Sequence, residues 1–141
     1  MNEIIVRFLQ QQTCATICCV DGREKPYCFS CFYAFNLEAG LLYFKSSIDS
    51  HHSALLKKNP LVAGTVLPDK LNALLVKGIQ FEGIVLDELH LLTKQSSGNY
   101  HKKHLLALAI PGETWAIQIN SIKMTDSAMG FGKKITWNKE E

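Results

Sequence analysis

Apolar and polar positions change their period several times along the chain, and each change marks an expected element. Apolar residues at positions 4, 5, 8 and 9 form the stripe of a short amphipathic helix over residues 3–12. Segments 13–20, 26–35 and 41–47 are rich in β-formers. The turns "DGREK" and "NLEAG" separate them, which predicts three strands of an antiparallel meander.

The second half of the chain continues this pattern. Pro68 ends one apolar segment, and Gly78 and Gly83 interrupt a longer one, where they suit bulges or sharp coiling of a strand. Glycines also punctuate the tail after residue 124. The expected elements are a short helix from residue 51, strands over 61–68, 73–89 and 114–124, and a helix over 96–110.

These elements predict a mainly β fold. About six β-segments with short connections and two or three small helices do not give the alternation of a parallel α/β sheet. They fit a small antiparallel β-barrel with helices at its ends. A length of 141 residues, of which 47% are hydrophobic, suits one domain over residues 1–141.

Charge and hydropathy exclude two classes of function. Fifteen Lys and Arg against thirteen Asp and Glu give a net charge of +2, which is too small to indicate a nucleic-acid binder. No segment approaches the roughly 20 apolar residues of a membrane span, and the N-terminus lacks the apolar core of a signal peptide. We therefore expect a cytoplasmic protein that binds neither nucleic acid nor membrane.

Five cysteines lie in the first quarter of the chain. Their odd number and the absence of cysteines elsewhere argue against a disulfide framework. Cys28 and Cys31 form a CxxC, but strand alternation sends their side chains to opposite faces. No second CxxC or nearby His pair completes a zinc site. We expect no metal, and interpret the cysteines as small buried hydrophobes in a reducing compartment.

The strand over residues 26–35 has two unlike faces. One face carries Tyr27, Phe29, Cys31, Tyr33 and Phe35, and the other carries Cys28, Ser30, Phe32 and Ala34. The second face is mostly small, so a flat ligand ring could approach the backbone amides there. Packing of that face against a helix is the alternative.

The segment "SIDSHHSALLKKNP" outlines an anion site. Ser50 stands where an N-cap belongs, and His51 and His52 fall in the first helical turn, where free amides and the helix dipole favour negative charge. Adjacent residues project about 100° apart on a helix, so the pair does not suit a shared metal ion. A catalytic base at either histidine stays open, although no Ser or Cys nucleophile motif accompanies it.

Two further basic pairs are less specific. His101 and His104 have the i, i+3 spacing of a helical chelate, but no third ligand lies close in sequence, which favours a solvated helix face. Lys133 and Lys134 follow two glycines in "GFGKK", where they could reach a phosphate on the same or a neighbouring chain. Ordinary surface lysines are the alternative.

Taken together, these segments resemble a known family. "GLLYFKSSIDSHHSALLKKNPLVAGTV" and "VKGIQFEGIVLDE" are similar to the cofactor region of the pyridoxamine 5'-phosphate oxidase-like FMN-binding split barrels. Counting back from Pro60, the family's Ser-Arg-Lys falls on Ser50, His51 and His52. "RFLQQQTCATIC", "SCFYAFN" and above all "IKMTDSAMGFGKKITW" resemble the YhbP-like bacterial proteins within that superfamily, over about residues 1–138.

The resemblance implies a homodimer of six-stranded split barrels with FMN in two clefts at the subunit interface. It implies that residues 44–47 line the ring and ribityl edge, that residues 50–52 hold the phosphate, and that the strand with Phe32 and Tyr33 runs beneath the ring. The implied cofactor-binding residues are Phe32, Tyr33, Phe44, Lys45, Ser46, Ser47, Ser50, His51, His52, Gln80, Lys133 and Lys134. The implied activity is that of an FMN-dependent oxidoreductase acting on an unidentified small-molecule substrate.

Departures from the family leave alternatives open. His51 and His52 replace two permanent charges with groups only partly protonated at neutral pH, so phosphate binding should strengthen as pH falls. The tail "WNKEE" lacks the Arg and His set with which the true oxidases hold pyridoxamine phosphate. His52 is the leading candidate for a general base, ranked below its role in phosphate binding. A non-catalytic flavin carrier or sensor and a haem-binding split barrel are the alternatives.

Overall fold

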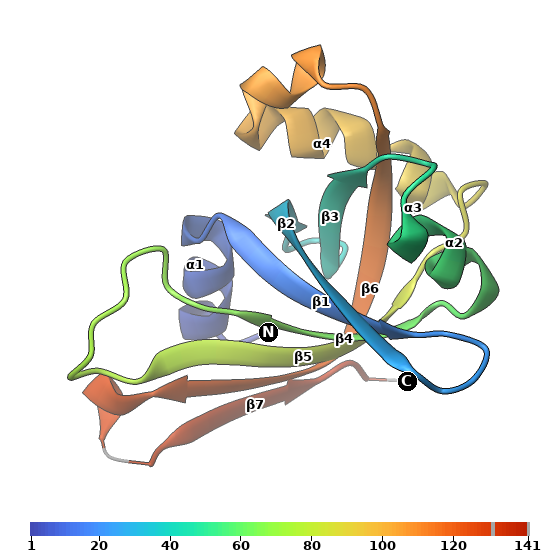
Figure 1. Ribbon diagram of the computed structural model, residues 1–141. Helices are drawn as coiled ribbons and strands as arrows, with labels where there is room; N and C mark the ends of the chain where they lie inside the picture. Colours follow the sequence, from blue (N-terminus) through green and yellow to red (C-terminus); the bar gives the residue numbers. More distant parts are fainter. Residues whose placement is uncertain (131, 141) are drawn as a thin grey trace.

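The computed structural model describes residues 1–130 and 132–140 and contains one antiparallel sheet. Its strands are β1 (Cys14–Val20), β2 (Pro26–Asn36), β3 (Leu41–Ser46), β4 (Leu61–Val66), β5 (Lys77–Val85), β6 (Glu113–Asp126) and β7 (Lys134–Asn138). They hydrogen-bond in the order β3-β2-β1-β4-β5-β6-β7. β3 also pairs with β6 from Leu41–Gln118 to Ser46–Glu113. This extra pairing closes the first six strands into the predicted six-stranded barrel (Figure 1).

β7 is an addition that the sequence pattern did not predict. It pairs with β6 between Ser121 and Thr125, outside the closed ring. Ile135 and Trp137 alternate with polar residues and pack against the core, so the segment has strand periodicity. The flanking glycines and the shortness of the segment hid this signal.

Helices cover the barrel on three sides (Figure 1). They are α1 (Glu3–Gln11), α2 (His51–Lys58), α3 (Leu91–Lys94) and α4 (Ser96–Lys103), with 3-10 turns at Leu105–Ala109 and Ser127–Met129. In Figure 1, α1 lies at the left of the barrel, α2 and α3 at the right, and α4 at the top. Phe8 of α1 and Leu56 of α2 are both buried in the same apolar cluster, so helices on opposite sides complete one core.

The strand predicted over 73–89 is shorter in the structure, at Lys77–Val85. Asn72 starts a turn in which its side chain accepts from the amide of Leu74 and its carbonyl accepts from Leu75. Leu74 is therefore 90% exposed, although its hydrophobicity suggested a buried strand. A local Asn turn has overridden the apolar run here.

The helix predicted over 96–110 divides at His104. That residue has φ −119° and ψ 71°, which is not helical, and it separates α4 from the 3-10 turn. Its imidazole Nε2 lies 2.6 Å from the Tyr33 carbonyl oxygen, a tertiary contact that anchors the break to β2.

The two glycines of β5 have different roles. The β5–β6 register shifts between Glu82 and Gly83, which confirms an irregularity at Gly83. A Cβ there would lie 2.5 Å from the Gln118 carbonyl oxygen, so the close approach of β6 requires glycine. Gly78 lies in regular pairing with Thr125, and the bulge considered there is absent.

Candidate functional site

The amino end of α2 contains the first part of the candidate site. Ser50 has extended backbone angles, and its hydroxyl accepts from the amide of Ser53 at 3.3 Å, which confirms it as the N-cap. The amides of His51 and His52 lie in the first turn, where no helical carbonyl can accept from them. These two N–H groups and the positive end of the helix dipole favour a negatively charged group.

Four serines surround this helix start, and we call Ser46, Ser47, Ser50 and Ser53 the serine cluster. The Ser50 hydroxyl lies 3.2 Å from that of Ser46 and 2.7 Å from that of Ser53. Ser50 and Ser53 both donate to the Ser47 carbonyl, at 2.9 and 2.8 Å. The cluster is therefore a compact group of donors and acceptors without a permanent charge. Sequence reasoning missed Ser53, although the Ser-x-x-Ser spacing of the cap could have indicated it.

His52 forms one wall of the cluster. Its ring stacks on Phe29 with the centroids 3.8 Å apart and the planes inclined by 8°. Its Nε2 lies 2.5 Å from the Ser46 hydroxyl oxygen. Burial of the ring, and secondarily the charge of His51, hold the pKa of His52 below its ordinary value. At neutral pH His52 thus acts as an uncharged hydrogen-bonding group.

His51 is more open than its neighbour. Its side chain is exposed, and its ring contacts Tyr27 edge-on at a centroid distance of 4.9 Å. The two histidines therefore contact Tyr27 and Phe29, which lie two residues apart on the same face of β2.

Two of the predicted cofactor residues have their side chains in the core. Phe44 is fully buried between Phe29 and Trp115, at centroid distances of 5.7 and 6.1 Å. Tyr33 is also fully buried, and its hydroxyl donates to the Leu9 carbonyl at 2.6 Å. The side chains of these two residues are therefore not available to a ligand on the outside of the barrel.

Phe32 has the opposite orientation. Its side chain is 56% exposed and stacks against His104 at a centroid distance of 5.6 Å. Cys28 and Ser30 share this outward face and are also exposed. This face is therefore open at Cys28 and Ser30, whereas Ala34 farther along it is 5% exposed and packs with Tyr100 of α4, so the alternative of helix packing holds for that end.

Lys45 points toward α4 instead of the serine cluster. Its ammonium donates to the Ala107 carbonyl at 2.7 Å and lies 3.0 Å from His101 Nε2. Strand alternation explains this, because Lys45 and Ser46 project from opposite sides of β3. The expectation of a solvated helix face is therefore wrong for both histidines of α4 and its end, because His101 contacts Lys45 of β3 and His104 contacts the Tyr33 carbonyl of β2.

Gln80, Lys133 and Lys134 lie away from α2. Gln80 is exposed in a hollow of about 650 Å³ on the outside of β1, β4, β5 and β6. Lys134 donates to the Thr125 hydroxyl at 2.7 Å. Within the described residues, no hydrogen bond joins these three side chains to α2 or the serine cluster. Of the predicted cofactor-binding residues, a single chain therefore brings together only those at the start of α2.

The cysteines depart in part from expectation. Cys19 is buried, whereas Cys14 and Cys28 are exposed, so the interpretation as buried hydrophobes is wrong for these two. The sulfur atoms of Cys18 and Cys28 lie 2.6 Å apart. This contact and burial raise the pKa of the Cys18 thiol. In residues 1–130 and 132–140, no group of three or more His, Cys, Asp or Glu side chains could hold a metal.

The helices of the described chain are short. None of those within residues 1–130 and 132–140 combines the length and apolarity needed to cross a membrane.

Comparison with known sequences identifies full-length relatives. A UPF0306 protein from Photorhabdus laumondii is 34% identical over 137 residues, covering 97% of this chain and 95% of the relative. A UPF0306 protein from Yersinia pestis strain Angola is 37% identical, covering 98% of this chain and 93% of the relative. No protein-family model matches the chain.

Solved structures share the fold at low sequence identity. A haem-binding protein from Mycobacterium smegmatis has a TM-score of 0.78 at 11% identity, over 94% of this chain and 55% of that protein. An FAD-binding protein from Mesorhizobium loti has a TM-score of 0.69 at 18% identity, over 89% of this chain and 95% of that protein. A NimC/NimA family protein from Clostridium acetobutylicum has a TM-score of 0.69 at 14% identity, covering 97% and 91%. These proteins are split barrels, so the predicted fold is confirmed.

Proposed function

The chain belongs to the UPF0306 family, and we propose that it is an FMN-binding homodimer acting as an oxidoreductase on a small-molecule substrate. The observation that carries this proposal is the helix start of α2, where free amides, the serine cluster and His52 converge. Bound FMN would supply the redox chemistry, and the protein would hold and orient it.

The helix start fits a phosphate monoester. A phosphate presents several acceptor oxygens, and the amides of His51 and His52 and the hydroxyl of Ser46 are donors, while the Ser50 hydroxyl donates to the Ser47 carbonyl and caps the helix. Ser50 and Ser46 already bond to one another at 3.2 Å, so a phosphate would exchange one hydroxyl contact for another at little cost. Neutral His52 contributes a hydrogen bond without the attraction of a permanent cation.

The outward face of β2 fits the flavin ring. Cys28 and Ser30 are small and exposed, so a flat ring can approach the strand backbone closely. Phe32 stands at the far end of this face with over half of its side chain exposed. Tyr33 and Phe44 would support the ring only as part of the barrel wall, because their side chains fill the core.

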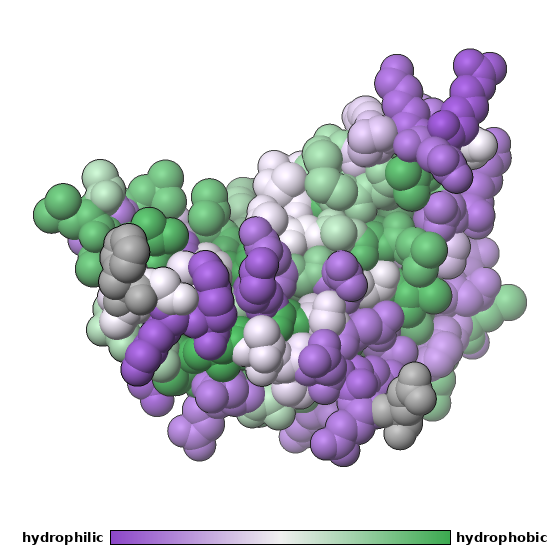
Figure 2. Space-filling view, turned by 90° about the horizontal axis from the view of Figure 1, so that it is seen from below, coloured by the Kyte–Doolittle hydropathy of each residue, from purple (hydrophilic) through white to green (hydrophobic). Residues whose placement is uncertain are grey.

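A second copy of the chain would complete the site. Gln80, Lys133 and Lys134 are exposed and remote from α2, so they could serve only the cofactor of a partner subunit. The loop between β4 and β5 exposes apolar side chains at the left of Figure 2, as suits a subunit contact. They are Leu67, Leu71, Leu74, Leu75 and Val76. The mass of the protein in solution tests this: a dimer that Leu74→Asp dissociates is the expected result.

The flavin assignment is tested on the purified protein. We expect a yellow protein whose released ligand has the mass of FMN, and bleaching by NADH or NADPH in the absence of oxygen. His52→Ala should weaken FMN binding by at least about tenfold, the effect of losing a hydrogen bond to a charged group. Lys58→Gln is the matched control, because it changes an exposed residue at the other end of the same helix. Equal losses in both variants would contradict the site.

Reduction separates the enzyme from a carrier. Bleaching followed by reoxidation with an added acceptor supports an oxidoreductase. A yellow colour that neither NADH nor NADPH bleaches would indicate a flavin carrier or sensor that does not turn over.

Haem binding is the second candidate, favoured by two structural neighbours. One is a haem-binding protein, and another, from Vibrio cholerae, is a haem storage protein with a TM-score of 0.62. An uncharged imidazole is a common iron ligand, and the neutral His52 and the exposed His51 meet that chemical requirement. A Soret band on addition of haem that disappears in His51→Ala or His52→Ala would favour this function over flavin binding.

A further inference from the structure

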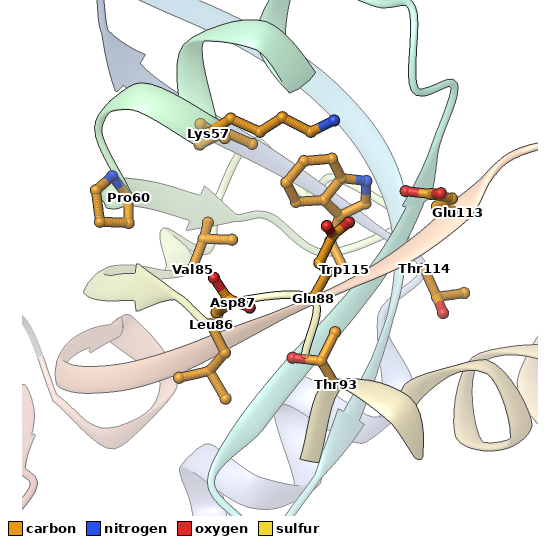
Figure 3. A pocket seen from close by; sticks show the side chains of 11 residues that line it. Lys57, Pro60, Val85, Leu86, Asp87, Glu88, Thr93, Glu113, Thr114 and Trp115 are labelled. Atoms are coloured by element: carbon orange, nitrogen blue, oxygen red, sulfur yellow. The ribbon is translucent and has the colours of Figure 1, made fainter. Parts of the chain in front are cut away.

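A separate cavity of about 320 Å³ lies beside the carboxyl-terminal half of α2 (Figure 3). Its walls come from four parts of the chain. These are α2, α3, the start of β6, and the segment directly after β5. In Figure 3 the Trp115 indole stands in the middle of the view, with Lys57 on one side and Thr93 on the other. The volume is at the lower end of the range of about 300–1,000 Å³ for small-molecule sites.

Two buried polar atoms in this wall have no hydrogen-bond partner among the described residues. They are Nε1 of Trp115, which can only donate, and Oγ1 of Thr93, which can donate or accept. Thr93 is only 8% exposed. The neighbouring Thr114 differs, because its hydroxyl lies 2.7 Å from that of Ser96. Unmet groups of this kind cost about 1–3 kcal/mol each, which a ligand could recover.

The charges around the cavity are mainly negative. Asp87, Glu88 and Glu113 supply three carboxylates against the single ammonium of Lys57. Within residues 1–130 and 132–140, none of these four groups forms an ion pair. The carboxyl end of α2 adds the negative pole of the helix dipole. The cavity therefore favours a cation and disfavours an anion.

We propose that this cavity binds a small organic amine. The protonated nitrogen would lie between the carboxylates and the Trp115 indole face, where a cation is attracted by the ring. A neutral acceptor on the same molecule, such as a hydroxyl or carbonyl oxygen, would receive hydrogen bonds from Trp115 Nε1 and the Thr93 hydroxyl. The site is independent of the flavin site, since it lies at the opposite end of α2.

Tyramine and 4-hydroxyphenylacetate form a matched pair of probes, because they differ in the charge at one end of a similar molecule. The indole N–H signals of Trp115 and Trp137 in a proton–nitrogen correlation spectrum report on binding, and Trp137 serves as the internal control. We expect millimolar tyramine to shift the Trp115 signal and leave Trp137 unchanged. The absence of a Trp115 shift, or an equal shift with 4-hydroxyphenylacetate, would overturn the proposal.

Two exposed variants test the sign of the charge effect without disturbing the core. Glu88→Gln should weaken tyramine binding about fivefold, since it removes an attractive charge. Lys57→Ala should strengthen it by a smaller factor, because it removes the competing ammonium. A weaker affinity in Lys57→Ala would contradict an amine site and indicate an anion instead. Unchanged thermal unfolding of both variants would show that their folds are intact.

Discussion

The two ends of α2 differ in chemistry and in how their residues are assembled. At the amino end, hydroxyls, free amides and an uncharged His52 gather within one stretch of the sequence. At the carboxyl end, carboxylates and an unpartnered indole N–H converge from two separate segments, the residues after β5 and the start of β6. The helix dipole favours an anion at the first end and a cation at the second. The two proposed ligands therefore carry opposite charges and lie at opposite ends of one eight-residue helix.

Phe44 of β3 packs between the residues at the two ends of α2. Its replacement should have the largest effect on the free energy of unfolding. It contacts Phe29, on which His52 stacks, and it contacts Trp115 in the cavity wall. Phe44→Ala should lower the free energy of unfolding in urea by about 3–5 kcal/mol. It should also shift the NMR signals of the His52 ring and of the Trp115 indole N–H.

Phe32→Ala is the control for that substitution, because the same residue type is more than half exposed there. We expect a change within about 0.5 kcal/mol. If Phe44→Ala perturbed only one end of α2, the two sites would not share a packed connection.

Removal of the helix cap should have the next largest effect. Ser50→Ala should lower the free energy of unfolding by about 1 kcal/mol. Ser50→Asp should retain the cap and lower it by only a few tenths of a kcal/mol. Ser50→Asp should nevertheless weaken FMN binding, because its carboxylate repels the phosphate. Urea unfolding and FMN titration would separate the two effects. A Ser50→Asp protein that kept full FMN affinity would place the phosphate elsewhere.

The carboxyl end of α2 allows a comparison of two threonines. The Thr93 hydroxyl is buried without a partner, so Thr93→Val should leave stability unchanged or raise it by up to about 1 kcal/mol. Thr114→Val breaks the contact with Ser96 and should lower stability by about the same amount. Equal destabilisation of the two variants, measured by urea unfolding, would show that the Thr93 hydroxyl is bonded in solution.

The pH dependence of His52 should give the smallest effect. Its pKa in the folded protein is below 6.5, so the unfolded chain binds the proton more readily. The stability from neutral His52 is therefore present above pH 6.5 and is lost as pH falls through the folded pKa. His52→Gln should flatten this part of the profile of urea midpoint against pH. A His52 carbon-bound proton that titrates at or above 6.5 would contradict the assignment.

That pKa also changes an expectation from the sequence. Two histidines in place of Arg and Lys suggested that phosphate binding would strengthen as pH falls through neutrality. Because His52 is stacked on Phe29 and partly buried, its contribution should begin only below pH 6.5. The sequence contains the histidine but not the burial that lowers its pKa.

Local patterns predicted the features that depend on neighbouring residues. Strand alternation separated the outward Phe32 from the inward Phe29, and the position of Ser50 predicted the helix cap. The same alternation could not show that Phe44 faces the barrel interior, because its neighbours on β3 are also largely apolar and buried. Barrel closure through β3 and β6 decides that orientation.

The remaining features depend on distant segments. Lys57, Glu88, Thr93 and Trp115 are spread from residue 57 to residue 115 of the chain, and no motif connects them. The exposed Leu74 shows the opposite failure, in which a hydrophobic run was interpreted as a strand although a local turn controls it. Periodicity reports how a segment is buried and gives no information on which other segments bury it.

The affinity ratio of FMN to riboflavin tests the central claim most directly, because the two molecules differ only in the phosphate. Titration calorimetry of the flavin-free protein should give FMN the higher affinity by at least about tenfold, the value of one charge-assisted hydrogen bond. In Ser50→Asp the ratio should fall toward unity while riboflavin affinity is unchanged. Equal affinity for FMN and riboflavin in the wild-type protein would contradict a phosphate site at the amino end of α2.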